Sequence, residues 1–216
     1  MATIVLIAGP SSSGKSTSMR NFASDELALI NVNKKPLPFR GKFDSLLETT
    51  DYDQIQKAIM STQKRAIVID DAGYLITHQF MSGHRENKGN AVFELYNDLA
   101  DNFYRLIKWC QTRIPDDKIV YFVMHVDKND FGETKPKTIG KMLDEKVCIE
   151  GLFTIALTSE YKDGKYVFHT KTDGLDFAKS PIGMFESDDI DNDLKMIDEK
   201  IRDYYELAPL TDKKGK

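Results

Sequence analysis

The most constraining feature of this sequence is an apolar run that leads into a turn rich in glycine and serine. Thr3 to Ala8 reads TIVLIA, a continuous run rich in β-branched residues. This pattern predicts a strand that is buried on both faces, as in a parallel sheet. The following stretch, Gly9 to Ser16, reads GPSSSGKS and matches the pattern GxxxxGK[ST]. The chain therefore joins a buried strand to a turn of the kind that binds phosphate.

Each part of this turn has a physical task. The glycines let the backbone wrap closely around an anion, so that successive amide groups point at the phosphates. A helix is expected from Gly14 or Lys15 to about Phe22, with the positive end of its dipole at the same charge. The pattern predicts that Lys15 reaches the β- and γ-phosphates of ATP and that the Ser16 hydroxyl binds Mg²⁺. The expected nucleotide-binding residues are Gly9, Pro10, Ser11, Ser12, Ser13, Gly14, Lys15, Ser16 and Thr17.

A second apolar run ends in two carboxylates. Residues 66–71 read AIVIDD, a Walker B pattern in which a hydrophobic strand delivers a carboxylate at its C-terminal end. In open α/β sheets this end of the strand faces the ligand crevice. We expect Asp70 to hold Mg²⁺ through a water molecule. Asp71 either positions or deprotonates the attacking water, or only caps the following turn.

The next apolar run, IVYFVMH over 119–125, closes on a histidine. If this strand lies beside the strand of residues 3–8, His125 faces the γ-phosphate and senses it by a hydrogen bond. The alternative is a histidine that is satisfied by local backbone. The almost wholly apolar residues before it favour the sensor role. Asp127 is a weaker candidate, because loop aspartates commonly form turns.

The periodicities along the chain predict an α/β fold. The expected strands are 3–8, 27–32, 65–70, 119–125, 152–158 and 165–170, and Asp163-Gly164 is a hairpin turn between the last two. The expected helices are 52–62 with Asp51 as its cap, 91–110, and a last one opened by the acidic stretch 186–193 and reaching about 205. Residues 33–43, 81–90 and 127–140 are expected to be loops. The alternation predicts a mostly parallel sheet flanked by helices, with a C-terminal antiparallel β-hairpin.

Length and composition limit the classes of protein. The 216 residues, 41% of them hydrophobic, predict one domain over 1–206, followed by a flexible basic tail over 207–216. The net charge of -4 excludes a general polyanion binder, so nucleic-acid contact requires a local basic patch. Cys110 and Cys148 are expected to be small buried hydrophobes in a reducing compartment. No segment has the pattern of a membrane span or a signal peptide, so we expect a cytoplasmic protein.

Four segments together resemble a known group of proteins. GPSSSGKST, AIVIDD, FVMH and the later KTDGLDFAKSP are similar to segments of the phage P-loop proteins with a RecA-like core, a group that includes single-strand annealing recombinases. The similarity covers about residues 3–185. Many families share the Walker motifs, whereas the histidine at the strand end and the KTDG…AKSP block are more specific to this group.

The resemblance implies a RecA-like ATPase that forms homo-oligomers and acts on single-stranded DNA beside a single-strand-binding protein, in the host cytoplasm if the chain is phage-encoded. RecA-like ATPases place nucleotide between subunits, with a cation from the neighbour. Lys171 and Lys179 are the candidates, although both also suit a solvated surface. These ATPases commonly carry a catalytic glutamate after the second strand, where this chain has Asn31-Val32-Asn33. Either Asp71 activates the water, or hydrolysis is slow and ATP acts as an assembly switch.

By the same resemblance, the loop after His125 faces DNA. Its aromatic residue is placed to stack on a base, and its lysines to contact phosphates. Three acidic residues lie among these lysines, and such mixed charge also suits a merely solvated loop. Arg40 and Lys42 mark another basic edge. The candidate DNA-binding residues are Lys128, Phe131, Lys135, Lys137 and Lys141.

Two other functions fit part of the sequence. A small-molecule nucleotide kinase also begins with a phosphate loop, but it needs an arginine-rich lid, for which Arg85 and Arg113 are the main candidates. The terminal hairpin is unexpected in that class. An ATP-gated interaction module with little hydrolysis fits the missing glutamate. The combined motifs favour an ATPase that acts in DNA recombination.

Overall fold

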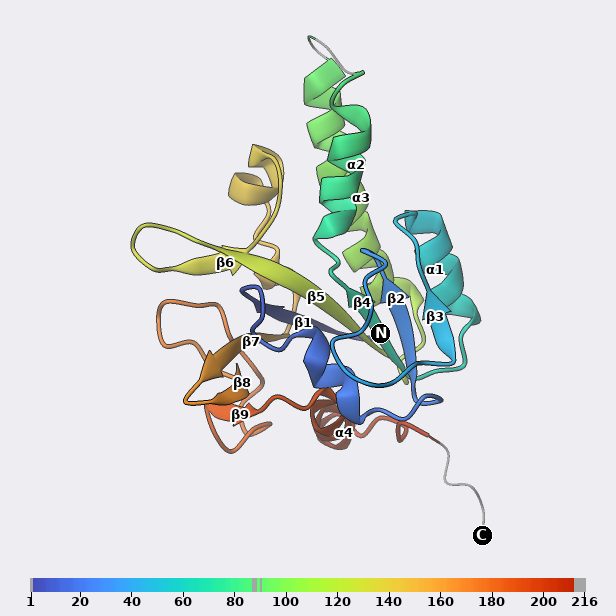
Figure 1. Ribbon diagram of the computed structural model, residues 1–216, viewed down its shortest axis with the longest axis vertical. Coiled ribbons are helices and arrows are strands. Elements are labelled where there is room, and N and C mark those ends of the chain that lie inside the picture. Colours follow the sequence, from blue (N-terminus) through green and yellow to red (C-terminus); the bar gives the residue numbers. More distant parts are fainter. Residues whose placement is uncertain (1, 87–88, 90, 212–216) are drawn as a thin grey trace.

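The computed structural model describes residues 2–86, 89 and 91–211, apart from the side chain of Asp144 (Figure 1). Within these residues, nine strands form a sheet in the order β3-β2-β4-β5-β1-β7-β8-β9, with β6 paired to β5. The strands from β3 to β7 in this order are parallel, whereas β8 and β9 are antiparallel additions at the edge. The predicted α/β class and mostly parallel sheet are therefore confirmed.

Six of the strands correspond to the predicted ones, and the three-residue strands β3, β6 and β9 do not. Three residues are too few to show a readable alternation. The predicted turn at Asp163-Gly164 does join β7 to β8, and both of its residues have positive φ, of 51° and 82°. The bounds are β1 Thr3–Gly9, β2 Leu27–Asn31, β3 Ser45–Leu47, β4 Ala66–Asp70, β5 Ile119–Lys128, β6 Thr134–Pro136, β7 Ile155–Lys162, β8 Lys165–His169 and β9 Asp189–Asp191.

The helices are only partly those expected. Asp51 caps the first one, where its Oδ1 accepts a hydrogen bond from the amide of Gln54 at 2.9 Å. The predicted loop 81–90 is wrong over its first three residues, which end a helix. The predicted loop 127–140 contains β6. The α-helices are α1 Tyr52–Ser61, α2 Tyr74–Gly83, α3 Ala91–Arg113 and α4 Leu194–Tyr204.

The acidic stretch before the last helix does two things that its charge alone did not predict. Its residues 189–191 form β9 at the sheet edge. The helix begins only after Asp193, whose carboxylate accepts hydrogen bonds from the amides of Lys195 and Met196. The predicted helix is therefore real, but only the last residue of the acidic stretch opens it.

Successive side chains of the central strands belong alternately to two apolar layers. On β1, Ile4, Leu6 and Ala8 belong to the layer covered by α1, α2 and α3 (Figure 1). Val5 and Ile7 belong to the other layer, covered by α4 and by the short helix after the phosphate loop. This division follows the period of two along a strand and explains why the run is apolar throughout. Among the described residues, no helix combines the length and the apolar character that crossing a membrane requires.

The two cysteines differ in environment. Cys110 is buried in α3, as predicted. Cys148 is exposed, so the prediction that it is buried is wrong, and its Sγ donates a hydrogen bond to Glu150 Oε1 at 3.0 Å. The neighbouring Ile149 is the residue that enters the core, at 3% exposure.

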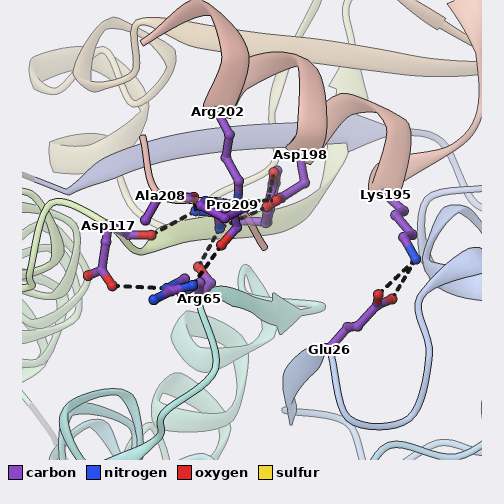
Figure 2. Close-up of polar contacts among 9 residues, drawn as sticks. Glu26, Arg65, Asp117, Lys195, Asp198, Arg202, Ala208 and Pro209 are labelled. Carbon is purple, nitrogen blue, oxygen red and sulfur yellow. Dashed lines mark hydrogen bonds and ion pairs between the residues drawn. The ribbon is translucent and has the colours of Figure 1, made fainter. Parts of the chain in front are cut away.

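A buried ion pair fastens α4 to the sheet. The Arg202 guanidinium donates to the Asp198 carboxylate, and these side chains are 3% and 0% exposed (Figure 2). Tyr121 on β5 donates its hydroxyl to Asp198 at 2.9 Å. Arg202 also donates to the backbone oxygens of Asp117 at 2.8 Å and Ala208 at 3.0 Å (Figure 2). A buried guanidinium thus has partners in the loop before β5, on its own helix and on the chain beyond it.

The packed structure extends past the predicted domain boundary at residue 206. The chain after α4 turns back, so that Ala208 meets Arg202 and Leu210 packs into the core at 9% exposure. Residues 212–216 of the predicted basic tail lie outside the described residues.

Replacing Arg202 by alanine is expected to lower the free energy of unfolding by about 3–5 kcal/mol, because the Asp198 charge stays buried without its partner. Arg105→Ala is the matched control, since Arg105 pairs with Asp101 at the same helical spacing but with side chains 73% and 56% exposed. The control should cost about 0.5 kcal/mol or less. Urea unfolding of both variants measures the difference. Equal losses would contradict the importance of burial.

Candidate functional site

The predicted phosphate loop is a tight turn at the end of β1. Ser12 and Gly14 have φ values of 63° and 95°, in the left-handed region. A Cβ on Gly9 would lie 2.5 Å from the backbone oxygen of Ser159 on β7, so the strand pair leaves no room for a side chain there. Ser159 also supports the loop directly, because its hydroxyl donates to the backbone oxygen of Ser13. The loop is thus held between β1 and β7.

The helix after the loop is shorter and tighter than predicted. A 3-10 helix, η1, covers Ser16–Asn21, whereas a helix was expected from Gly14 or Lys15 to about Phe22. The Ser18 amide is shared between the backbone oxygens of Gly14 and Lys15, at 2.9 and 3.3 Å. The Ser18 hydroxyl donates a further hydrogen bond to the backbone oxygen of Lys15. Serine side chains compete with the helical backbone in this way. The helix that follows the phosphate loop is therefore only six residues long.

Lys15 is buried beneath the loop. Its Nζ donates to the backbone oxygens of Gly9 at 2.9 Å and Pro10 at 2.6 Å, and the residue is 6% exposed. Burial lowers the pKa of Lys15 to about 8. An anion within the loop would favour the charged form of this ammonium.

Ser16 and Asp70 connect the loop to β4. The Ser16 hydroxyl donates to Asp70 Oδ1 at 2.9 Å. Burial, together with the charge of Asp71, raises the pKa of Asp70 to about 6, so a nearby cation would stabilise its carboxylate. No cluster of three or more histidine, cysteine or acidic residues suited to a metal occurs in the described part of the chain. A hydroxyl and one carboxylate do fit Mg²⁺, which keeps several waters and takes its other ligands from substrate phosphates.

Asp71 is held by three donors. Asn33 Nδ2 lies 2.6 Å and Lys35 Nζ 3.1 Å from its Oδ2, and His125 Nε2 lies 3.3 Å from its Oδ1. Its backbone is left-handed, with φ of 57°. Burial opposes the charge, but the bonds from His125, Asn33 and Lys35 outweigh it and hold the pKa of Asp71 well below its usual range. Such a carboxylate is a weak proton acceptor and a strong anchor for the groups around it.

The position of His125 meets the condition on which its prediction depended. β5 lies between β1 and β4, and His125 is aligned with Gly9. Its ring makes an edge contact with Tyr74, with centroids 5.8 Å apart. The prediction that the strand ends at His125 is wrong. The strand continues to Lys128, because β6 pairs with its last residues. A sensing role for His125 stays a prediction.

These groups line one cavity of about 250 Å³ at the carboxyl ends of β1, β4 and β5. The structure therefore brings together the predicted phosphate loop, both aspartates and His125. Neither lysine proposed to act across an interface lines it, nor do Arg85 and Arg113, the candidates for a kinase lid. Lys171 instead pairs with Asp188 at 2.8 Å on the surface. The lining residues are Ser11, Ser12, Ser13, Gly14, Lys15, Ser16, Thr17, Lys35, Pro36, Pro38, Asp70, Asp71 and His125.

The predicted DNA-facing loop is a hairpin made by β5 and β6, which projects from the body (Figure 1). Asn129 organises its turn, since its side-chain oxygen accepts from the amides of Phe131 at 3.0 Å and Glu133 at 2.9 Å. Phe131 is 86% exposed in this turn. Of the candidate lysines, Lys137 pairs with Asp127 at 3.0 Å. The hydrogen bonds of Asn129 thus hold the turn from which the exposed side chain of Phe131 projects.

Sequence reasoning missed Lys35 and Asn33, which both reach Asp71. Their segment has two prolines and several cations and is predicted to be a loop, with no contact to Asp71 expected. The available signal was its position, since a segment that follows β2 leaves the sheet at the edge where the ligand crevice lies.

No known protein-family profile matches this chain, and no match is found among curated proteins.

Replacing Gly9 by alanine is expected to destabilise the chain by about 1–3 kcal/mol, because the new methyl group overlaps a backbone oxygen that cannot move without separating β1 from β7. Gly41→Ala is the control, since its Cβ would meet only the ring of Phe39, at 3.3 Å. Urea unfolding without added ligand measures both. A Gly9→Ala chain as stable as the parent would show that the loop is not confined in this way.

Proposed function

We propose that this chain is a RecA-like P-loop ATPase that binds Mg²⁺·ATP in the cavity at the ends of β1, β4 and β5. The observation that carries the proposal is the convergence of the loop and Lys15 with the Ser16–Asp70 pair and with His125 in that cavity. Exposed amides and an ammonium suit the phosphates. A hydroxyl and a carboxylate suit the metal.

Each group has a role in this proposal. Lys15 exchanges the backbone oxygens of Gly9 and Pro10 for the β- and γ-phosphate oxygens. Ser16 and Asp70 hold the metal, and Thr17 supports the α-phosphate side. When bound, Mg²⁺ supplies charge that offsets the phosphate oxygens.

Hydrolysis requires a water oxygen to bond to the γ-phosphorus while the bond to the β–γ bridging oxygen breaks. We propose that Asp71 and His125 orient this water. Asp71 is poorly suited to remove its proton, because three donors already hold the carboxylate. With Asn31 and Asn33 at and just after the end of β2, where the resemblance implies a glutamate, turnover is proposed to be slow. These two observations also favour the second candidate, an ATP-gated interaction module.

Single-stranded DNA is the proposed partner, with contact through the β5–β6 hairpin. The strand that places His125 in the cavity continues into this hairpin and leads to Phe131. Nucleotide binding and a base-stacking residue are thus connected by one continuous strand. We propose that Phe131 stacks on a base and that Lys128, Lys135, Lys137 and Lys141, in and after the hairpin, contact phosphates.

The similarity to phage recombination proteins supports the wider setting. We propose that the chain forms homo-oligomers, acts beside a single-strand-binding protein and works in the cytoplasm of a host cell. Lys171 and Lys179 stay candidates for a cation that reaches a neighbouring subunit. The exposed position of Lys171, with a side chain 63% accessible, is compatible with that role.

Lys15→Ala is expected to abolish binding of Mg²⁺·ATP, because it removes the ammonium that faces the phosphates. Asp71→Ala is expected to keep binding and to lose turnover, since Asp71 orients groups around the water. Isothermal titration calorimetry and single-turnover hydrolysis measure the two effects, with Lys57→Ala, an exposed lysine on α1, as the control. Unchanged ATP affinity in a folded Lys15→Ala chain would refute the proposed site.

Phe131→Ala is expected to weaken binding to an oligothymidine strand about tenfold or more, because stacking contributes about 1–3 kcal/mol per base. Ile182→Ala is the matched control, since Ile182 is 96% exposed but lies outside the hairpin. Fluorescence anisotropy at low salt with Mg²⁺·ATP measures both. Absence of binding by the parent chain under these conditions would count against a DNA partner, because phosphate contacts are strongest there.

A further inference from the structure

The segment after β2 holds the backbone of one lysine at a fixed place beside the cavity. Asn31, 6% exposed at the end of β2, donates its side-chain amide to the backbone oxygen of Lys35 at 2.7 Å. Its side-chain oxygen accepts from the Lys35 amide at 3.3 Å. Pro36 follows and restricts the backbone further. A buried asparagine therefore determines where Lys35 lies.

The side chain of Lys35 is largely exposed, although its backbone is held. It is 61% exposed, and its Nζ lies 3.1 Å from Asp71 Oδ2 and 5.3 Å from the centre of the Tyr74 ring. Lys35 lines the same cavity as the phosphate loop. A long side chain with a charged head at such a position reaches a new partner in the cavity by rotamer changes alone.

Asp71 can release Lys35 without becoming an unpaired buried charge. Its Oδ2 also accepts from Asn33 at 2.6 Å, and its Oδ1 faces His125 at 3.3 Å. Two donors thus stay in place when the ammonium leaves. A triphosphate, by contrast, brings several negative oxygens into a cavity whose other lysine, Lys15, is buried beneath the loop.

We propose that Lys35 exchanges Asp71 for an oxygen of the γ-phosphate when ATP binds, and that it thereby distinguishes ATP from ADP within a single chain. This inference rests on the proposed nucleotide site. It places a cation of the same chain at the γ-phosphate, in addition to any that Lys171 or Lys179 of a neighbouring subunit supplies. A cation on the γ-phosphate also offsets the charge that this group carries during transfer.

The test compares the affinities of Mg²⁺·ATP and Mg²⁺·ADP by isothermal titration calorimetry. Lys35→Gln should weaken ATP binding about tenfold and change ADP binding less than twofold, because charge-assisted hydrogen bonds to phosphate are strong. Lys34→Gln removes the same charge one residue earlier and should change both affinities less than twofold. Lys35→Arg keeps the charge and should retain most of the preference for ATP. Thermal unfolding confirms that each variant is folded.

A double-mutant cycle tests the exchange itself. Asp71→Asn removes the partner that competes for Lys35, so it should increase the preference for ATP over ADP. In the Lys35→Gln background the same substitution should have a clearly smaller effect, because no ammonium is left to release.

The outcomes separate the two proposals. If the parent binds neither nucleotide, the proposed site itself is refuted. If the parent binds both but Lys35→Gln weakens them equally, or weakens neither, the role of Lys35 at the γ-phosphate is refuted while the site stands. An equal effect of Asp71→Asn in both backgrounds would refute the exchange of partners.

Discussion

The parallel pairing of β1, β5 and β4 is the constraint on which the candidate site depends. Gly9 is aligned with His125, and β4 ends beside them at Asp70. Because parallel strands end at the same edge, three segments far apart in the sequence deliver their polar residues to one cavity. A shift of one residue in β5 would turn His125 to the opposite face and separate it from Asp71. The alternation of side chains between the two core layers therefore also determines which polar side chains meet at the edge of the sheet.

The neighbouring aspartates acquire opposite properties from this arrangement. Burial and the nearby charge of Asp71 raise the pKa of Asp70 to about 6, so Asp70 is a carboxylate that a cation would stabilise. Asp71 turns away through a left-handed backbone and meets three donors, which lower its pKa. Titratable neighbours whose environments move their pKa values apart suit different tasks. One suits metal binding, and the other suits the positioning of side chains.

Much of the fold could be predicted, because long apolar runs such as residues 3–8 and the periodic helix α3 carry strong local signals. The short strands could not, since pairing with neighbouring strands rather than local pattern forms them, and no helix was predicted over any part of α2. The predicted helix after the loop was too long, because the hydroxyl of Ser18 competes for the backbone. Lys35 was not predicted as a site residue for a different reason. Its position depends on a side-chain clamp from Asn31, which leaves no periodic trace in the sequence.

Asn31 ends β2 and Asn33 follows it, where the resemblance to RecA-like ATPases implies a glutamate. An amide cannot accept a proton at neutral pH, but it can donate and accept hydrogen bonds at the same time. Asn31 uses both capacities to hold the backbone of Lys35, and Asn33 donates to Asp71 while its oxygen contacts His78 at 3.0 Å. The segment that would otherwise supply a base is thus used for positioning. It presents a cation to the cavity and satisfies a carboxylate there, an arrangement better suited to recognising a charged ligand than to rapid proton transfer.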